Sequence, residues 1–312
     1  MPAYDIDGVR IDASSVFVNV KDFGAKGNGT ADDASAIQSA IDSVKISGGT
    51  IFFPAGTYSV SAIIRFYSNQ HLLFDRNAIL EGGSSSYNAL LLGYVNSSAG
   101  GYTGLQNVII DGGTFRRGSL ASSSTLIGFS HAKNVMVKNA VLIGAPAWHD
   151  LEFNSTQFGI AENCVFDGTY KNLSSGCQIQ LDNCDGSNYP WSDVGLSDQT
   201  ACDGIEIRSC WFENNTASPY IGSHSNSGKN VRIYDCTFNG NTGTRGAIQF
   251  DTCLNLDVFN NTFTGCTTGI SFTGTGATSC SVHDNRFTDA TTAIDSNISV
   301  KYNNWINGTF TE

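Results

Sequence analysis

Residues 107–115 read Asn107-Val108-Ile109-Ile110-Asp111-Gly112-Gly113-Thr114-Phe115, and this nine-residue pattern decides the fold because it returns along the chain. Later copies begin at Asn134, Phe158, Gly204, Asn230, Asn255, Ser279 and Asn297. The ninth position is a large apolar residue in every copy, namely Phe115, Leu142, Phe166, Phe212, Phe238, Phe263, Phe287 and Trp305. The fourth position is also apolar throughout, with Ile110, Val137, Ala161, Ile207, Ile233, Val258, Val282 and Val300.

The spacing of these copies predicts the architecture. Most copies follow one another after 24 to 27 residues, which leaves room for short strands and turns but not for a helix. Such a repeat is typical of a solenoid of stacked β-coils. We therefore predict an all-β chain: a single-stranded, right-handed parallel β-helix over residues 18–312, preceded by an N-terminal extension at 1–17. The 34 glycines, 5 prolines and 14% charged residues agree with one elongated domain.

The seventh position of the pattern predicts stacked ladders inside the coils. It holds small residues first, then cysteines, then asparagines: Gly113, Ala140, Cys164, Cys210, Cys236, Asn261, Asn285 and Asn303. Asparagine tolerates a left-handed backbone and can donate a hydrogen bond to its own copy in the next coil. We expect the cysteines to be free thiols that pack as small apolar residues.

Composition excludes several classes of protein. There are nine cysteines, without a C-x-x-C pair or a tight Cys/His cluster, so neither a disulfide framework nor a zinc site is expected. The net charge of −11 argues against nucleic acid as a partner, because phosphates bind to basic surfaces. No stretch reaches the roughly 18 apolar residues of a membrane span, and the polar start lacks the pattern of a signal peptide.

The region from Val18 to Tyr58 carries a family resemblance. Its motifs are Asp22-Phe23-Gly24-Ala25-Lys26-Gly27-Asn28-Gly29-Thr30-Ala31-Asp32-Asp33 and Gly48-Gly49-Thr50-Ile51-Phe52-Phe53-Pro54-Ala55-Gly56-Thr57-Tyr58. They resemble the opening of the pectate-lyase-like superfamily, whose members include polygalacturonase-like hydrolases, lyases, epimerases and phage tailspike depolymerases. The resemblance implies a carbohydrate-active β-helix located outside the cell or on a virion, and a homotrimer if it is a tailspike. It does not fix the reaction, because the acidic motifs of polygalacturonases and of mannuronan epimerases are absent as such.

The same region predicts a helix over about residues 31–45. We expect Thr30 to cap a first turn that carries Asp32 and Asp33. One apolar stripe follows, made of Ala36, Ile37, Ala40, Ile41 and Val44. The helix would close the N-terminal end of the solenoid, where the first coil otherwise exposes its core.

Polar residues form two columns on the strands that precede the copies. One column holds Ser130, Asn154, Asp182, Asp251 and, after a longer connection, His224. The other, two residues earlier on each strand, holds Gly128, Glu152, Gln180, Gln249 and Gly222. Because side chains alternate across a strand, both columns share one face, whereas the residues between them point into the core. We predict a localised groove here, with Trp148 and His149 beside it as a platform for a sugar ring.

A long interval in the repeat adds an insertion at about residues 183–203. Long loops inside a compact repeat are usually functional. This one begins directly after Asp182 and contains Tyr189 and Trp191, so we expect it to wall one side of the groove. Cys184 and Cys202 bracket the insertion, and their pairing is left open.

The residues support glycoside hydrolysis, which needs one protonated carboxyl and one carboxylate. Our candidates are Glu152 and Asp182, with Asp251 able to replace either, while His149 and His224 bind hydroxyls or tune the pKa values of the carboxyls. Crowding of the acidic residues would raise one pKa, as an acid catalyst at neutral pH requires. The expected substrate contacts are Trp148, Asn154, Gln180, Gln249, Asp203, Tyr189 and Trp191.

Two alternatives remain open. A polysaccharide lyase would use His149 or His224 as the base and neutralise a uronate with Asn154 and Gln180, or with Ca²⁺ held by Asp182 and Glu152. The absence of Lys and Arg from the columns argues against it. A protein that only binds a glycan would use the same aromatic and amide groups, and no other cofactor or metal is predicted. A purely structural role is also open for Asn154 and Gln180, as hydrogen-bonded ladders between coils, and we expect His131 and His283 to be plain surface residues.

Overall fold

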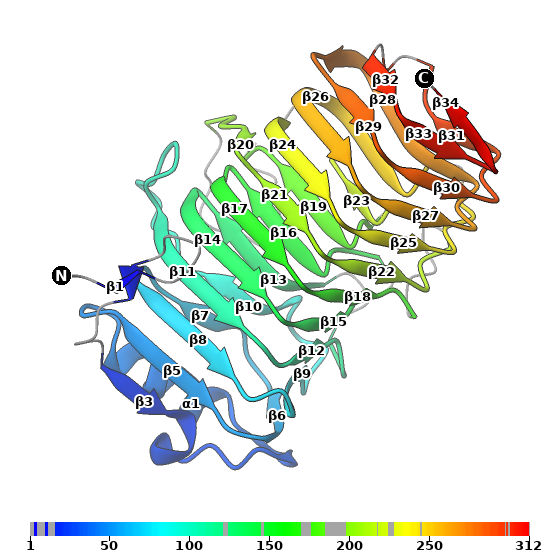
Figure 1. The fold of residues 1–312 in the computed structure, drawn as a ribbon. Coiled ribbons are helices and arrows are strands. Elements are labelled where there is room, and N and C mark those ends of the chain that lie inside the picture. Colours follow the sequence, from blue (N-terminus) through cyan, green and yellow to red (C-terminus); the bar gives the residue numbers. More distant parts are fainter. Residues whose placement is uncertain are drawn as a thin grey trace.

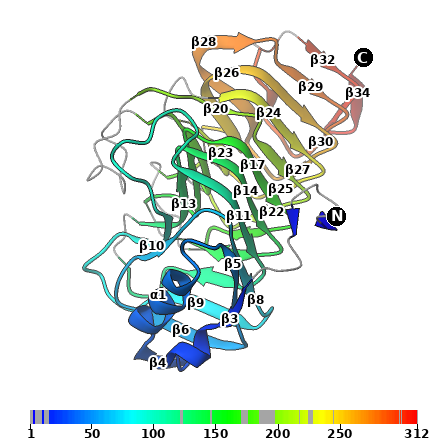
Figure 2. The ribbon, with the colours of Figure 1, turned by 90° about the vertical axis from the view of Figure 1, so that its left-hand side faces the viewer.

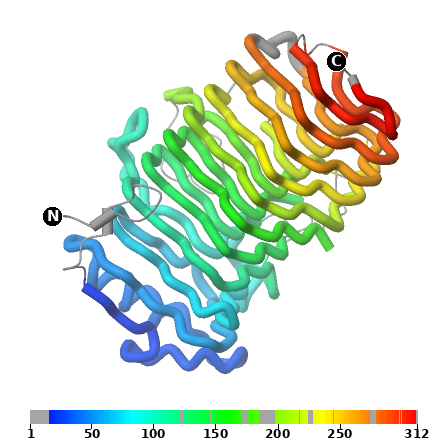
Figure 3. The backbone as a smooth tube through the Cα atoms, viewed as in Figure 1, coloured from blue at the N-terminus to red at the C-terminus, as the bar shows by residue number. Residues whose placement is uncertain are grey.

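A computed structural model describes residues 3–4, 10–11, 16–120, 124–144, 147–169, 176–184, 198–216, 218–223, 228–243, 245–296, 298 and 300–311. The chain winds into coils that stack from the N-terminus to the C-terminus in one elongated body (Figures 1 and 3). This is the predicted right-handed parallel β-helix. Strands of neighbouring coils pair in parallel, and only β1 with β2 and β33 with β34 pair antiparallel among the described strands.

Each coil contributes strands to three faces. The first face is formed by β7 (Ile64–Phe66), β10 (Ala89–Gly93), β13 (Thr125–Ser130), β16 (Leu151–Asn154), β19 (Ile179–Asp182), β23 (Ile221–Gly222), the starts of β26 (Ile248–Phe259) and β28 (Thr268–Thr278), and β31 (Thr292–Ile294). The second is formed by β3 (Phe17–Asn19), β5 (Gly49–Phe53), β8 (Gln70–Phe74), β11 (Leu105–Asp111), β14 (Ala132–Lys138), β17 (Gln157–Glu162), β20 (Cys202–Asp203), β21 (Glu206–Arg208), β24 (Gly228–Tyr234), the ends of β26 and β28, β29 (Ser281–His283) and β32 (Val300–Tyr302).

The third face is one sheet of twelve strands. Its strands are β4 (Asn28–Asp32), β6 (Gly56–Val60), β9 (Ala78–Gly82), β12 (Thr114–Arg116), β15 (Val141–Ile143), β18 (Val165–Asp167), β22 (Trp211–Glu213), β25 (Thr237–Asn239), β27 (Thr262–Thr264), β30 (Arg286–Thr288), β33 (Asn304–Ile306) and β34 (Thr309–Thr311). A short hairpin of β1 (Ala3–Tyr4) and β2 (Arg10–Ile11) lies in the N-terminal extension.

The ninth column of the pattern forms the centre of the core, as expected. Phe166, Phe212, Phe238, Phe263 and Phe287 stack ring on ring, with centroids 4.5 to 4.9 Å apart. Each such pair contributes about 0.5–1.5 kcal/mol beyond the burial of its surface. The stack therefore holds successive coils in register from the middle of the chain to its C-terminal end.

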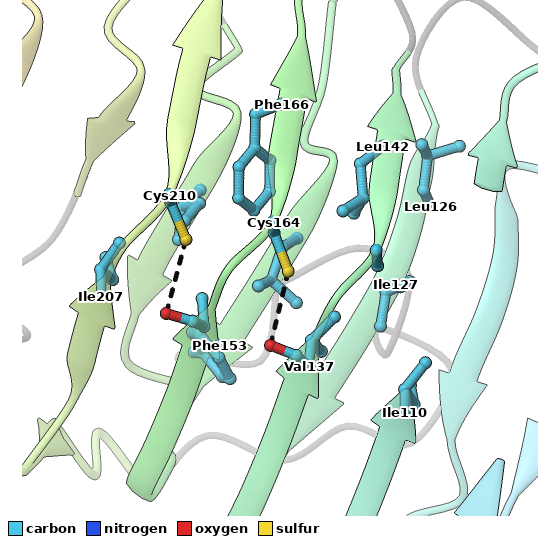
Figure 4. Close-up of a cluster of buried hydrophobic side chains, with 14 of the residues drawn as sticks. Ile110, Leu126, Ile127, Val137, Leu142, Phe153, Cys164, Phe166, Ile207 and Cys210 are labelled. Carbon is cyan, nitrogen blue, oxygen red and sulfur yellow. Dashed lines mark hydrogen bonds between the residues drawn. The ribbon is translucent and has the colours of Figure 1, made fainter. Parts of the chain in front are cut away.

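The seventh column forms the two predicted ladders. All nine cysteines are buried free thiols, and Cys164 donates to the carbonyl of Val137 in the core (Figure 4). Further along, Asn261 Nδ2 donates to Asn285 Oδ1 at 3.0 Å, and both of these asparagines are buried. The left-handed residue of each turn precedes the ladder, however: Asn260, not Asn261, has a positive φ of 55°.

The last copy of the pattern was predicted one residue too early. Phe287 pairs with Ile306 rather than Trp305, and the ladder continues from Asn285 to Asn304 at 3.1 Å. Trp305 and Val300 are 42% and 45% exposed. The final coil is shorter than the others, so its apolar residues fit two alignments, and the buried asparagine selects the later one.

Helix α1 (Ala34–Ser43) closes the N-terminal end, after the 3-10 turn η1 (Val20–Phe23) (Figure 2). Ile37, Ala40, Ile41 and Val44 are buried, as the predicted stripe requires. The predicted cap is wrong: Thr30 lies in β4, and the helix follows Asp33.

The carboxylate of Asp33 does not cap α1 either. It accepts the backbone N–H groups of Lys26 and Gly27 at 2.6 and 3.0 Å. The N–H groups of the preceding glycine-rich turn therefore occupy the carboxylate of Asp33, which does not accept from the N–H groups of the helix N-terminus.

Candidate functional site

The two polar columns lie on the first face, at the predicted register. Gly128 pairs with Glu152, Glu152 with Gln180, Gln180 with Gly222, and Gly222 with Gln249. In the second column Ser130 pairs with Asn154, and Asn154 pairs with Asp182. Glu152 and Asp182 are therefore diagonal neighbours on adjacent strands, β16 and β19.

The columns are buried, whereas the sequence predicted an open groove. Asn154 and Gln180 are 0% exposed, Glu152 3%, Gln249 5% and Asp182 8%. The interior side of the same strands is apolar, with Leu151, Phe153, Ile179 and Leu181 fully buried. The middle coils thus place carboxylates and amides in a layer that is almost free of water, where electrostatic effects are strong.

Glu152 has a strongly raised pKa. Its Oε2 lies 2.9 Å from Thr125 Oγ1, and its Oε1 accepts from Asn154 Nδ2 at 2.7 Å. Burial, with a further contribution from the charge of Asp182, raises the pKa of Glu152 to about 8, although both hydrogen bonds oppose this shift. A carboxyl with such a pKa is protonated at neutral pH.

Asp182 is slightly more exposed than Glu152. Gln180 Nε2 donates to Asp182 Oδ2 at 2.9 Å, whereas Gln180 Oε1 is buried and has no hydrogen-bond partner. A protonated Glu152 beside a charged Asp182 would give the division of roles that acid–base catalysis needs. The free Gln180 oxygen is an acceptor that a substrate hydroxyl could satisfy.

Asp251 and Gln249 lie further along the same face and are not brought into the carboxyl pair by any hydrogen bond among the described residues. Asp251 Oδ1 accepts from Thr273 at 3.0 Å. Gln249 Oε1 accepts from Arg245 Nε at 2.6 Å. Arg245 is the one guanidinium linked to the columns by a hydrogen bond in the described part of the chain.

Trp148 and His149 lie on the approach to β16. Trp148 is partly exposed, and His149 is 8% exposed with its Nδ1 3.1 Å from the carbonyl of Cys177. Because a carbonyl only accepts, Nδ1 carries the proton, and a neutral His149 would present Nε2 as an acceptor. Both residues keep their predicted roles as hypotheses.

The insertion is anchored at both of its described ends. Cys184 N donates to Ser155 Oγ at 2.8 Å, and Ser155 Oγ donates to the carbonyl of Thr200 at 2.7 Å. Cys184 and Cys202 do not form a disulfide. The thiol of Cys202 donates to the carbonyl of Phe153 instead, and burial raises its pKa to about 12.

A second loop, residues 94–104, is tied to the insertion and was not foreseen. Tyr102 OH donates to the carbonyl of Ala201 at 2.8 Å, and the N–H of Gly101 donates to Asp198 Oδ2 at 2.7 Å. His131 is fully buried beneath this contact, with Nδ1 2.8 Å from the carbonyl of Gly101, so its assignment to the plain surface is wrong. His283 also differs, because it stacks between Phe259 and Tyr302.

Several predicted site residues are placed elsewhere or not described. Asp203 lies on β20 of the second face, where Asn230 Nδ2 donates to it at 2.7 Å, so it belongs to a ladder between coils. Tyr189, Trp191 and His224 lie outside the described residues. Thr125, which contacts Glu152 from β13, was not among the predicted site residues, because it lies outside the two polar columns.

The described residues contain no group of three or more His, Cys, Asp or Glu side chains that could hold a metal ion. Both oxygens of Glu152 have hydrogen-bond partners within the protein. The Ca²⁺ ion that the lyase alternative would use stays a prediction. No helix in this part of the chain is long and apolar enough to span a bilayer.

Two relatives illustrate the range of proteins that this chain resembles. The plasmin and fibronectin-binding protein A of Streptococcus pneumoniae (strain ATCC BAA-255 / R6) is 25% identical over 299 residues, which cover 86% of this chain and 39% of that protein. Alginate lyase 7 of Azotobacter vinelandii is 37% identical over 107 residues, which cover 30% of this chain and 12% of that protein. The chain therefore spans well under half the length of either relative.

Solved structures confirm the fold. The structure of PfbA, a surface adhesin of Streptococcus pneumoniae, superimposes with a TM-score of 0.77 at 18% identity and covers 93% of this chain and 78% of that one. The family 28 exopolygalacturonase of Yersinia enterocolitica gives a TM-score of 0.69 at 16% identity, covering 97% and 69%. At these identities the likeness concerns the fold alone.

The family is shown by the sequence. A model of the family described as rhamnogalacturonase A/epimerase, pectate lyase-like, matches residues 17–295, which is nearly the whole β-helix. This match agrees with the resemblance of the first coils and with the parallel stacking of the strands. The chain belongs to the rhamnogalacturonase A/epimerase, pectate lyase-like family.

Proposed function

We propose that this protein cleaves glycosidic bonds in a polysaccharide by hydrolysis, with Glu152 as the general acid. Asp182 is the carboxylate that activates water or attacks the anomeric carbon. Asn154 and Gln180 orient the two carboxyls and contact sugar hydroxyls. Trp148 supplies an apolar surface for a sugar ring, and His149 accepts a hydroxyl proton in a hydrogen bond.

The observation that carries this proposal is the contrast between two neighbouring carboxyls. Glu152 is buried, with a pKa raised to about 8 by burial and by the charge of Asp182. Asp182 has an amide donor in Gln180 at 2.9 Å, which favours its charged form. A retained proton on one carboxyl and a charge on the other are the two components of glycoside hydrolysis.

β-Elimination on a uronate is the second reaction that the family allows, and the chemistry of the columns is less suited to it. A lyase must neutralise the uronate carboxylate and remove the neighbouring proton. No Lys or Arg lies in either column, and Arg245 donates to Gln249, toward the far end of the columns from Glu152. Because one relative is named alginate lyase 7, the experiment below also detects β-elimination.

Binding without cleavage is supported by another relative. The Streptococcus pneumoniae protein is named for binding plasmin and fibronectin, and it matches most of this chain. On the same ground we propose that this protein acts outside the cell, on a cell surface or a virion. A polysaccharide remains the proposed partner because a pure binder gains nothing from a protonated carboxyl beside a charged one.

The reaction can be identified by incubating the protein with neutral and uronic-acid polysaccharides. New reducing ends and the ultraviolet absorbance of unsaturated uronates are followed together. The proposal predicts reducing ends without absorbance. A joint rise in both would contradict it in favour of β-elimination, and retention of a glycan on the protein without either signal would favour binding.

Two variants test the roles of the carboxyls. E152Q and D182N should each lower the turnover number at least a hundredfold, because general acid catalysis contributes about 10²–10⁴. D203N is the matched control, because Asp203 lies on the second face, in a ladder with Asn230, and its substitution should leave turnover nearly unchanged. Equal activity of E152Q and wild type would exclude Glu152 as the acid.

A further inference from the structure

Thr125 contacts the proposed acid from the neighbouring coil. It begins β13, it is fully buried, and its Oγ1 lies 2.9 Å from Glu152 Oε2. Its own backbone is fixed, because its N–H donates to the carbonyl of Asn88 at 3.0 Å. The hydroxyl therefore reaches Glu152 from a rigid strand rather than from a loop.

The hydrogen bonds of Glu152 determine which oxygen carries its proton. Asn154 Nδ2 can only donate, so Glu152 Oε1, 2.7 Å away, must be an acceptor. A proton on Glu152 therefore belongs on Oε2, opposite Thr125. A threonine hydroxyl can both donate and accept, which an amide nitrogen cannot.

We propose that Thr125 is a positioning residue that keeps the acidic proton of Glu152 on Oε2 and holds the carboxyl in one orientation in both protonation states. When Glu152 is protonated, its O–H donates to Thr125 Oγ1. When Glu152 is ionised, the hydroxyl of Thr125 turns and donates to Oε2. Asn154 keeps the same contact with Oε1 throughout.

This inference rests on the proposed hydrolysis and deepens it. As the glycosidic C–O bond breaks, the proton leaves Glu152 Oε2 for the oxygen of the departing sugar. Water supplies the hydroxyl group that ends on the anomeric carbon, and the remaining proton of that water is taken up by a carboxylate of the pair, which returns Glu152 to its protonated form. The ionised Glu152 would otherwise be a buried charge with one donor, and the hydrogen bond from Thr125 stabilises it at that moment.

The test compares T125V with T125S. Valine has nearly the shape of threonine but no hydroxyl, while serine keeps the hydroxyl. In protein labelled at the glutamate carboxyl carbon, NMR titration reports the midpoint of Glu152, which E152Q identifies by the loss of its signal. We expect T125V to raise the midpoint by roughly one pH unit and T125S to restore it.

Activity supplies an independent readout. With the polysaccharide that the wild type cleaves, T125V should lower kcat about tenfold with little change in KM and shift the pH profile, and T125S should recover most of both. T237V is the matched control, because Thr237 lies on β25 of the third face. It should change neither the midpoint nor the rate.

The outcomes separate this inference from the proposed function. An unchanged Glu152 midpoint in T125V would overturn the role of Thr125, whether or not the protein cleaves a glycan. A wild type that cleaves no polysaccharide, together with the expected midpoint shift, would overturn hydrolysis and with it the catalytic use of the proton, while the hydrogen-bond assignment would stand.

Discussion

At the scale of single residues, the fold changes the acid–base chemistry of Glu152. Its carboxyl faces an amide, a hydroxyl and a second carboxyl, in a layer that excludes water. Burial favours the neutral form and the charge of Asp182 favours it further, so the pKa rises from 4.5 to about 8. Folding must therefore retain a proton that the unfolded chain releases at a lower pH.

The retained proton makes stability depend on pH. Between about pH 4.5 and 8 the folded state binds more protons than the unfolded state, so stability falls as pH rises through this range. E152Q imitates the protonated form, because its amide can donate to Thr125 and accept from Asn154. We expect E152Q to match the wild type at pH 4 and to be a few kcal/mol more stable at pH 9, since one pKa unit corresponds to about 1.4 kcal/mol.

Denaturant unfolding at several pH values checks this prediction. Contributions from other titrating groups cancel in the difference between the two proteins. E213Q is the control, because Glu213 lies on the third face and should give no pH-dependent difference. A constant difference between E152Q and the wild type across the range would show that Glu152 titrates normally.

The residues of the site could be predicted from the sequence only in part. Glu152, Gln180, Asn154 and Asp182 were placed correctly because side chains alternate along strands whose register the repeat defines. Their burial could not be predicted, because the repeat defines the register of the strands but not the exposure of their outer side. Thr125 was overlooked because the local sequence gives no sign that this hydroxyl meets a carboxyl from another coil.

At the scale of elements, the N-terminal helix shows where local signals compete. The apolar stripe of α1 was predicted because a period of 3.6 residues is distinct from the surrounding strands. The start of the helix was not, because Asp33 binds Lys26 and Gly27 instead of the helix N-terminus. Several consecutive polar residues could each cap the helix. Which of them does so depends on the three-dimensional path of the turn before it.

The contact of α1 with the first coils can be measured through one side chain. Ile37 is fully buried, and I37A should lower the free energy of unfolding by about 2–5 kcal/mol, because the truncation leaves a cavity. The control S39A removes an exposed hydroxyl from the same helix and should change stability by less than about 0.5 kcal/mol. Denaturant unfolding distinguishes the two, and equal stabilities would mean that α1 does not seal the solenoid.

At the scale of the whole molecule, the fold was predictable because the same pattern of apolar and turn residues recurs in every coil of the repeat. The phenylalanine column forms one continuous stack, and the asparagine column forms a buried ladder. The exception is the final coil, where one shorter step moved the predicted register by a residue. The contact between loop 94–104 and the insertion could not be predicted, because it joins two segments that lie outside the repeat.

The whole structure positions the two carboxyls of adjacent coils so that one proton remains on Glu152 at neutral pH. An infrared difference spectrum between the wild type and E152Q at pH 7 tests this most directly. The account predicts the carbonyl stretch of a protonated carboxylic acid in the wild type, with conversion to carboxylate bands at a midpoint near pH 8. Carboxylate bands for Glu152 already present at pH 6 would contradict it and remove the proposed general acid.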